Sequence, residues 1–190
     1  MNIGVLALQG DFFKHIEKLK ALGIDPIAVR KPNELMKCRG LIIPGGESTT
    51  LIKLLKNIDL YDALSEFNRE HVIFGTCAGA ILVSTKVANR NVDSLGLIDI
   101  DVTRNAYGRQ IDSFVDNVTV QIGEKQHDVE AVFIRAPKIT RVGEGVKVIG
   151  RHKSDVVMVE SDAVIAATFH PELTDCLLIH QHFIDKIRKS

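Results

Sequence analysis

The chain has 190 residues, which is enough for one domain with a substantial buried core. It carries 24 Lys and Arg against 24 Asp and Glu, with no basic block or acidic tail, so we expect neither nucleic acid nor a membrane surface as a partner. Its three cysteines, Cys38, Cys77 and Cys176, lie far apart without CxxC spacing, which indicates reduced thiols rather than disulfides or a zinc site.

In the first half of the chain, apolar runs alternate with helix-period segments, the pattern of βα units on a mostly parallel sheet. We predict buried strands at residues 3–8, 26–30, 40–44 and 71–75. Helices are predicted after Asp11, a candidate N-cap, from about Ser48, and over residues 78–87.

The second half is richer in strands, and some of them can be antiparallel. The expected strands lie within residues 98–105, 115–122, 130–135, 146–150, 156–160 and 163–169. A last helix is predicted over residues 174–189, with Cys176, Ile179, Phe183 and Ile187 on its apolar face. His180 and His182 point to different sides of such a helix, so we expect solvated positions rather than a metal pair.

The expected fold is α/β, a single three-layer domain over residues 1–190 with a mostly parallel mixed central sheet.

The start of the chain gives no sign of export. It enters an apolar run without the basic segment and the small-residue cleavage site of a secretory signal. No apolar stretch approaches the length that spans a membrane. We therefore expect a cytoplasmic protein.

Cys77 lies in the stretch FGTCAGA, where an apolar run stops between two glycines. A strand, G-x-C-x-G and a helix form the thiol counterpart of a nucleophile elbow, in which small neighbours permit the strained turn. At that place the thiolate benefits from the helix N-terminus, and the amide of Ala78 points toward an oxyanion. The alternative is a small buried cysteine that fills a tight corner.

A thiol nucleophile also needs a base and a group that orients the base. The segment FHPEL offers His170 and Glu172, which face the same side if the segment is extended. His170 follows a strand, as Cys77 does, and the carboxyl ends of parallel strands share one rim. An ordinary surface turn with His and Glu is the alternative.

The segment PGGES also follows a strand. Its glycines let the backbone approach a ligand, so the amide of Gly46 is a candidate second oxyanion donor. The lysine and the glycine spacing of a phosphate loop are absent. In the alternative interpretation this is a glycine turn with Ser48 as a helix cap, and both can hold together.

PGGES, GTCAG and FHPEL, in this order, resemble the class I glutamine amidotransferase family, whose architecture is flavodoxin-like. LALQG, RNAYGRQIDSF and VFIRAP extend the match across nearly the whole chain to the glutaminase subunits of two-component pyridoxal 5′-phosphate synthases. The departures are modest: DFFKH, with two phenylalanines after the first loop, NAYGRQ in place of NSFGRQ, and Ala80 at the end of the elbow.

The resemblance implies that Cys77 is the nucleophile, His170 the base and then the acid, and Glu172 the residue that orients His170. It implies contacts with L-glutamine, and these fall on Gly46, Glu47, Ser48, Arg104, Ile134 and Arg135. Without the resemblance, Arg104 and Arg135 are read as exposed arginines at strand ends.

The implied activity is hydrolysis of L-glutamine to glutamate and ammonia, without a metal or an organic cofactor. The ammonia would pass to a synthase subunit that builds pyridoxal 5′-phosphate. Three alternatives stay open: a class I amidotransferase of another pathway, a related hydrolase such as a γ-glutamyl peptidase, and a non-catalytic flavodoxin-like regulatory or binding module.

Overall fold

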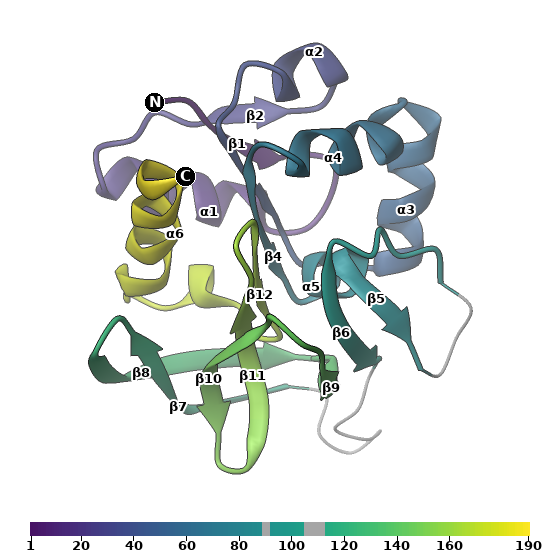
Figure 1. Ribbon diagram of the computed structural model, residues 1–190. Coiled ribbons are helices and arrows are strands. Elements are labelled where there is room, and N and C mark those ends of the chain that lie inside the picture. The colour runs from purple at the N-terminus through teal and green to yellow at the C-terminus, as the bar shows by residue number, and fades with distance from the viewer. Residues whose placement is uncertain (89–91, 105–112) are drawn as a thin grey trace.

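The computed structural model describes residues 1–88, 92–104 and 113–190, and a large sheet runs through its centre (Figure 1). Within these residues the sheet has nine strands in the order β2-β1-β3-β4-β12-β11-β10-β7-β8. The five parallel strands are β2 (Ile27–Val29), β1 (Ile3–Leu6), β3 (Gly40–Ile43), β4 (Val72–Thr76) and β12 (Val164–Ala167). The antiparallel strands are β11 (Asp155–Glu160), β10 (Lys147–His152), β7 (Ser113–Ile122) and β8 (Lys125–Ile134). The predicted mixed sheet with a parallel core is confirmed.

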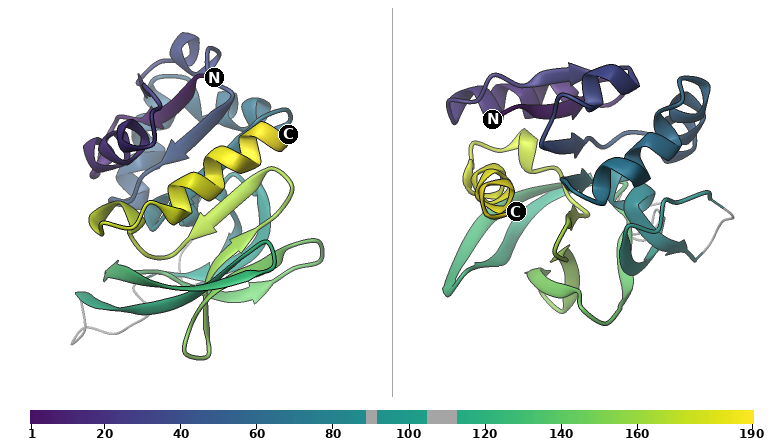
Figure 2. Two further views of the ribbon diagram at one scale, coloured as in Figure 1. Left: turned by 90° about the vertical axis from the view of Figure 1, so that its left-hand side faces the viewer. Right: turned by 45° about the horizontal axis from the view of Figure 1, so that its top comes forward.

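Helices cover both faces of the parallel core, which gives the expected three layers (Figures 1 and 2). On one face lie α1 (Phe12–Ala21) and α6 (Leu178–Lys189). On the other lie α3 (Ser48–Asn57), α4 (Leu60–Asn68) and α5 (Ala78–Val83), and the short α2 (Pro32–Leu35) follows β2. Strands β1, β3 and β12 are buried at every position because helices cover both of their faces. Helix α4 was not among the predicted elements.

A second sheet corrects the prediction of one helix over residues 78–87. Helix α5 ends at Val83, and the chain continues as β5 (Ser84–Val87), which pairs in parallel with β6 (Ile98–Thr103). The hydroxyl of Ser84 donates to the carbonyl of Ile81 at 2.8 Å, and the β-branched residues Thr85 and Val87 favour a strand. Strand β9 (Lys138–Val142), which was not predicted, completes this sheet antiparallel to β6.

The predicted start of the last helix at residue 174 was wrong. Residues Pro171–Leu173 form a short 3₁₀ turn, η1, and α6 begins only at Leu178. The hydroxyl of Thr174 accepts a hydrogen bond from the amide of Cys176 at 3.3 Å, which favours a turn over a helix. Cys176 therefore precedes the helix and is not part of its apolar face.

The parallel core brings the carboxyl ends of β1, β3, β4 and β12 to one rim of the sheet. The loops that follow these strands carry residues 7–11, 44–47, 77 and 168–172. This is the edge at which open α/β sheets bind ligands. Among the described residues, no helix is both long and apolar enough to cross a membrane.

Candidate active site

Cys77 occupies a sharp turn between β4 and α5. Its φ of 48° and ψ of −101° are strained for a residue with a side chain. A Cβ on Gly79 would lie 2.1 Å from the carbonyl oxygen of Ile43, and a Cβ on Gly75 would lie 2.6 Å from the carbonyl of Gly79. The turn is therefore possible only because both neighbours are glycine, and it presents the thiol at the sheet rim.

His170 and Glu172 lie in direct contact at the end of β12. Nδ1 of His170 is 2.7 Å from Oε1 of Glu172, and both residues are buried. The segment does not continue extended as predicted, because η1 begins at Pro171, yet the two side chains still meet. The amide of His170 donates to the carbonyl of Val132 at 2.8 Å, so β8 holds the loop in place.

Gly45 lies next to both Cys77 and the imidazole of His170. A Cβ on Gly45 would lie 2.4 Å from Cε1 of His170 and 3.2 Å from Cβ of Cys77. Burial lowers the pKa of His170, but hydrogen bonds with Cys77 and Glu172 raise it to about 10. His170 is therefore an imidazolium at neutral pH, the form that stabilises a neighbouring thiolate.

We expect the imidazole of His170 to titrate near pH 10 in the native chain and at a lower pH in Glu172→Gln, which removes the negative charge. The folded pKa lies above the ordinary 6.5, so the stability contributed by this group is fully present below pH 6.5. It is lost as the pH rises through about 10. A ¹⁵N NMR titration of the ring nitrogens measures the midpoint. A native midpoint at or below 6.5 would contradict the expectation.

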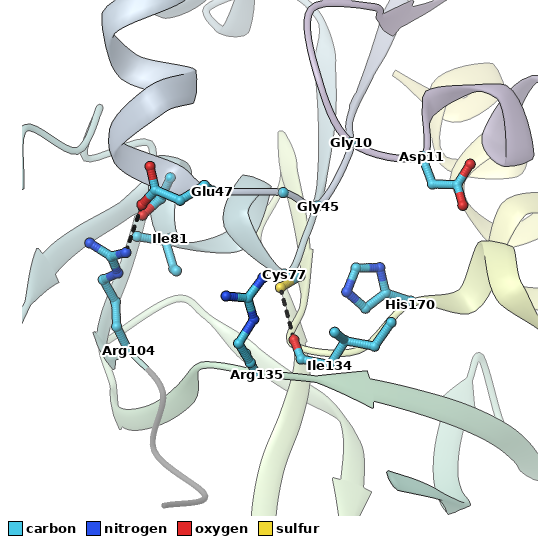
Figure 3. A pocket seen from close by; sticks show the side chains of 12 residues that line it. Gly10, Asp11, Gly45, Glu47, Cys77, Ile81, Arg104, Ile134, Arg135 and His170 are labelled. Carbon is cyan, nitrogen blue, oxygen red and sulfur yellow. Dashed lines mark hydrogen bonds and ion pairs between the residues drawn. The ribbon is translucent and has the colours of Figure 1, made fainter. Parts of the chain in front are cut away.

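A cavity of about 210 Å³ opens beside the thiol. It is smaller than the roughly 300–1,000 Å³ of pockets for drug-sized ligands, which favours a small metabolite. Figure 3 shows Cys77 between His170 on one side and Arg135 on the other. The lining residues are Gly10, Asp11, Gly45, Gly46, Glu47, Ser48, Cys77, Ile81, Arg104, Ile134, Arg135 and His170.

Glu47, and not Ser48, caps helix α3. Its carboxylate accepts hydrogen bonds from the amides of Thr49 and Thr50 and from both hydroxyls. Burial raises the pKa of Glu47, but these hydrogen bonds lower it to about 2. The same carboxylate lies 2.9 Å from Nη2 of Arg104. Ser48 is the first helical residue, and its Oγ is buried without a hydrogen-bond partner among the described residues.

The loop after β1 supports the PGGES loop. Nε2 of Gln9 donates to the carbonyl of Glu47 at 2.8 Å. A Cβ on Gly10 would lie 1.9 Å from the carbonyl oxygen of Gly45, so only glycine fits there. Asp11 makes no side-chain cap bond to α1, contrary to prediction, and lines the cavity instead. Gln9, Gly10 and Gly45 were not predicted as site residues, because their role depends on contact between two loops distant in sequence.

The other predicted site residues lie around the same cavity. Ile134 ends β8, and its carbonyl oxygen is 3.8 Å from Sγ of Cys77. Arg135 follows with a φ of 44° and an exposed side chain. Ala78 is the first residue of α5, directly after the thiol. Of the RNAYGRQIDSF segment, residues 105–112 lie outside the described residues. Within the described ranges, no group of three His, Cys, Asp or Glu side chains is arranged to hold a metal ion.

Comparison with known proteins gives consistent matches over nearly the full length of the chain. The model of the SNO glutamine amidotransferase family matches residues 5–189. Pyridoxal 5′-phosphate synthase subunit PdxT of Thermosipho africanus is 48% identical over 190 residues, which is 100% of each chain. The protein of the same name from Solibacter usitatus is 47% identical over 190 residues, covering 98% of this chain and 99% of the relative.

A solved structure described as a glutamine amidotransferase has the same fold. It matches with a TM-score of 0.92 at 41% sequence identity, and the match covers 98% of both chains. The similarity therefore extends over nearly the whole of both chains.

Proposed function

Because the chain belongs to the SNO glutamine amidotransferase family, we propose that it is the glutaminase subunit of a pyridoxal 5′-phosphate synthase. It hydrolyses L-glutamine to glutamate and ammonia, and the ammonia is used by a separate synthase subunit. The whole chain, residues 1–190, forms the glutaminase domain. We place this activity in the cytoplasm, and it requires no metal or organic cofactor.

The observation that carries the proposal is the meeting of Cys77, His170 and Glu172 beside a small cavity. The three residues come from two distant loops, and Gly45 lies next to both Cys77 and His170. A structural cysteine does not need a buried His–Glu pair next to it. A catalytic cysteine does need such a pair, because the imidazole supplies the proton that the leaving group of the substrate requires.

In the first step the thiolate of Cys77 attacks the carboxamide carbon of glutamine. The electron pair of the carbonyl moves onto oxygen, and the amides of Gly46 and Ala78 are the proposed donors to this oxyanion. When the oxyanion collapses, the C–N bond breaks and His170 gives its proton to the leaving nitrogen. Ammonia departs, and a γ-glutamyl thioester remains on Cys77.

In the second step His170, now neutral, takes a proton from water as the water attacks the thioester. The C–S bond breaks, glutamate leaves, and the thiolate and the imidazolium are restored. Glu172 holds Nδ1 of His170 throughout, so Nε2 stays directed at the reacting atoms.

The charged residues of the cavity suit a free amino acid. Arg104 and Arg135 are the proposed partners of the substrate carboxylate. Glu47 is fully occupied by its threonine donors and Arg104, so we propose that it acts mainly by orienting Arg104. The unpartnered Oγ of Ser48 and the carbonyl of Ile134 are available to the ammonium and amide groups of glutamine.

The function is tested by measuring glutamate release from glutamine with and without the synthase subunit. We expect weak release from the chain alone and clear activation on docking, because ammonia released without an acceptor is lost. Full activity in isolation would contradict the partner dependence. No release in either condition would contradict the glutaminase assignment.

Two observations separate the alternatives. The synthase that co-purifies with the chain distinguishes the vitamin pathway from another amidotransferase pathway. Labelling of Cys77 by a glutamine-mimicking chloroketone distinguishes an enzyme from a non-catalytic module, in which Cys77 would stay unmodified.

A further inference from the structure

A buried cluster of polar side chains continues from Glu172 into the interior. It includes residues of α1 and α6, the two helices on one face of the sheet (Figures 1 and 2). Its members come from four elements and are almost completely inaccessible: His15 on α1, Thr76 on β4, Glu172 on η1 and His180 on α6. Nε2 of His15 lies 3.3 Å from Oε2 of Glu172, and Nδ1 of His15 lies 3.0 Å from Nε2 of His180. His180, predicted to be solvated, has an exposed fraction of 0%.

The carboxylate decides which nitrogen of His15 carries the proton. Oε2 of Glu172 is buried and accepts no hydrogen bond of standard geometry from the described residues. If Nε2 of His15 carried a lone pair, two electron-rich atoms would lie 3.3 Å apart in the interior. A proton on Nε2 turns this repulsion into an attraction to the carboxylate, and Thr76 Oγ1 lies 3.4 Å from the same nitrogen.

The second histidine supports the same arrangement. With Nε2 of His15 protonated, its Nδ1 is an acceptor, so His180 donates through Nε2. Nδ1 of His180 then carries only a lone pair, and it has no partner among the described residues. The opposite tautomer would leave a buried N–H donor without an acceptor, which proteins avoid more strictly.

Both histidines are neutral. Burial, with His180 and His170 nearby, lowers the pKa of His15 well below its usual range. Burial and Lys18 lower the pKa of His180 to about 3. A neutral His15 can donate to Glu172 without competing with His170 for its negative charge.

We propose that His15 is a positioning residue, which donates through Nε2 to Oε2 of Glu172 and keeps the other carboxylate oxygen directed at His170. His180 supports this tautomer of His15 by donating to its Nδ1. The chain of contacting polar side chains at the site therefore has five members rather than three and reaches from the cavity to helix α6. This inference rests on the proposed function, because its consequence is the state of the catalytic imidazolium.

The surroundings of Glu172 contain few other groups that could take this role. The titratable and charged groups near it are His15, Lys14, Glu17 and Lys18 from α1, and His170 and Asp175 from its own loop. Cys77 lies beyond His170, and His180 lies beyond His15. The ammonium of Lys18 contacts the carbonyl of Thr174. His15 is the group whose side-chain nitrogen lies beside the unpartnered oxygen.

The test compares His15→Asn with His15→Gln in the complex with the synthase. The amide nitrogen of Gln reaches the place of Nε2 and can still donate to Glu172, whereas Asn reaches only the place of Nδ1 and loses this donor. We expect Asn to lower kcat about tenfold with KM unchanged, and Gln to restore most of kcat. His182→Gln is the matched control, because His182 lies on α6 but pairs with Glu160 at 2.8 Å outside the cluster.

A second readout does not depend on glutamine turnover. In His15→Asn the less firmly held carboxylate supports the imidazolium less well, so the ¹⁵N NMR midpoint of His170 falls by roughly half to one pH unit. In His15→Gln and His182→Gln it stays at the native value. Unchanged kcat and midpoint in a folded His15→Asn variant overturn the proposal, as does equal impairment by Asn and Gln. A native chain that releases no glutamate contradicts the proposed function instead, and the NMR comparison still tests the role of His15.

Discussion

Cys77→Ala is expected to lower glutamine hydrolysis by at least about 10⁴-fold, because the replacement removes the sulfur that we propose forms the thioester. The cavity, the His170–Glu172 pair and the fold stay in place, since alanine fits the space of a residue that is 6% exposed. Pyridoxal 5′-phosphate synthesis from added ammonium by the complex should continue at the native rate. Glutamate release is measured by a coupled assay in the presence of the synthase.

The other two cysteines supply matched controls for this experiment. Burial, with a contribution from Glu34, raises the pKa of Cys38 to about 11, so this thiol is unreactive at neutral pH. Cys176 is partly buried and lies outside the residues that line the cavity. Replacing either by alanine should leave turnover unchanged. A Cys77→Ala variant that still released glutamate would falsify the nucleophile assignment.

The parts of the site that lie close together in the sequence could be predicted from it. Cys77 with Gly75 and Gly79 forms one local turn, and its chemistry follows from residue types within five positions. His170 and Glu172 are two residues apart, so their contact was predicted even though the backbone between them is a 3₁₀ turn and not extended. Local geometry constrains such neighbours strongly, whatever the exact backbone conformation.

Residues that act across long sequence distances were not found in this way. His15 and His180 are 165 positions apart, and each is an unremarkable histidine on a helix when its segment is read alone. Their burial depends on how α1 and α6 pack over β4, which no periodicity of either helix specifies. The expectation that His180 is solvated was wrong for this reason.

The errors in element boundaries have a similar physical origin. Residues 84–87 directly follow the apolar run of α5, but pairing with β6 draws them into a strand. The start of α6 is delayed to Leu178 by the turn at Thr174, in which a side chain competes with the helix for a backbone amide. In both places a tertiary or side-chain contact outweighs the helix propensity of a few residues.

Gly45→Ala is expected to lower glutamine turnover about 100-fold while the protein stays folded. The added methyl carbon would lie 2.4 Å from Cε1 of His170, whereas ordinary contacts begin at 3.4 Å, so the imidazole must move by about 1 Å. A displacement of that size is enough for such a loss, because the displaced imidazole cannot keep its contacts with Cys77 and with Glu172 at the same time. The loss should appear in kcat, measured in the complex with the synthase.

Stability should change little, because the methyl group meets a side chain and not the backbone. The strain that Gly45→Ala introduces therefore depends on the ring of His170. A double-mutant cycle with His170→Ala can measure this dependence. In a His170→Ala background, Gly45→Ala should have little further effect on the rate at which iodoacetamide alkylates Cys77, because the displaced ring is gone and only the 3.2 Å contact with Cβ of Cys77 remains. In the native background it should change that rate together with kcat. Native turnover in Gly45→Ala, or an equal effect with and without the imidazole, would mean that the absence of a side chain at Gly45 does not hold the imidazole in place.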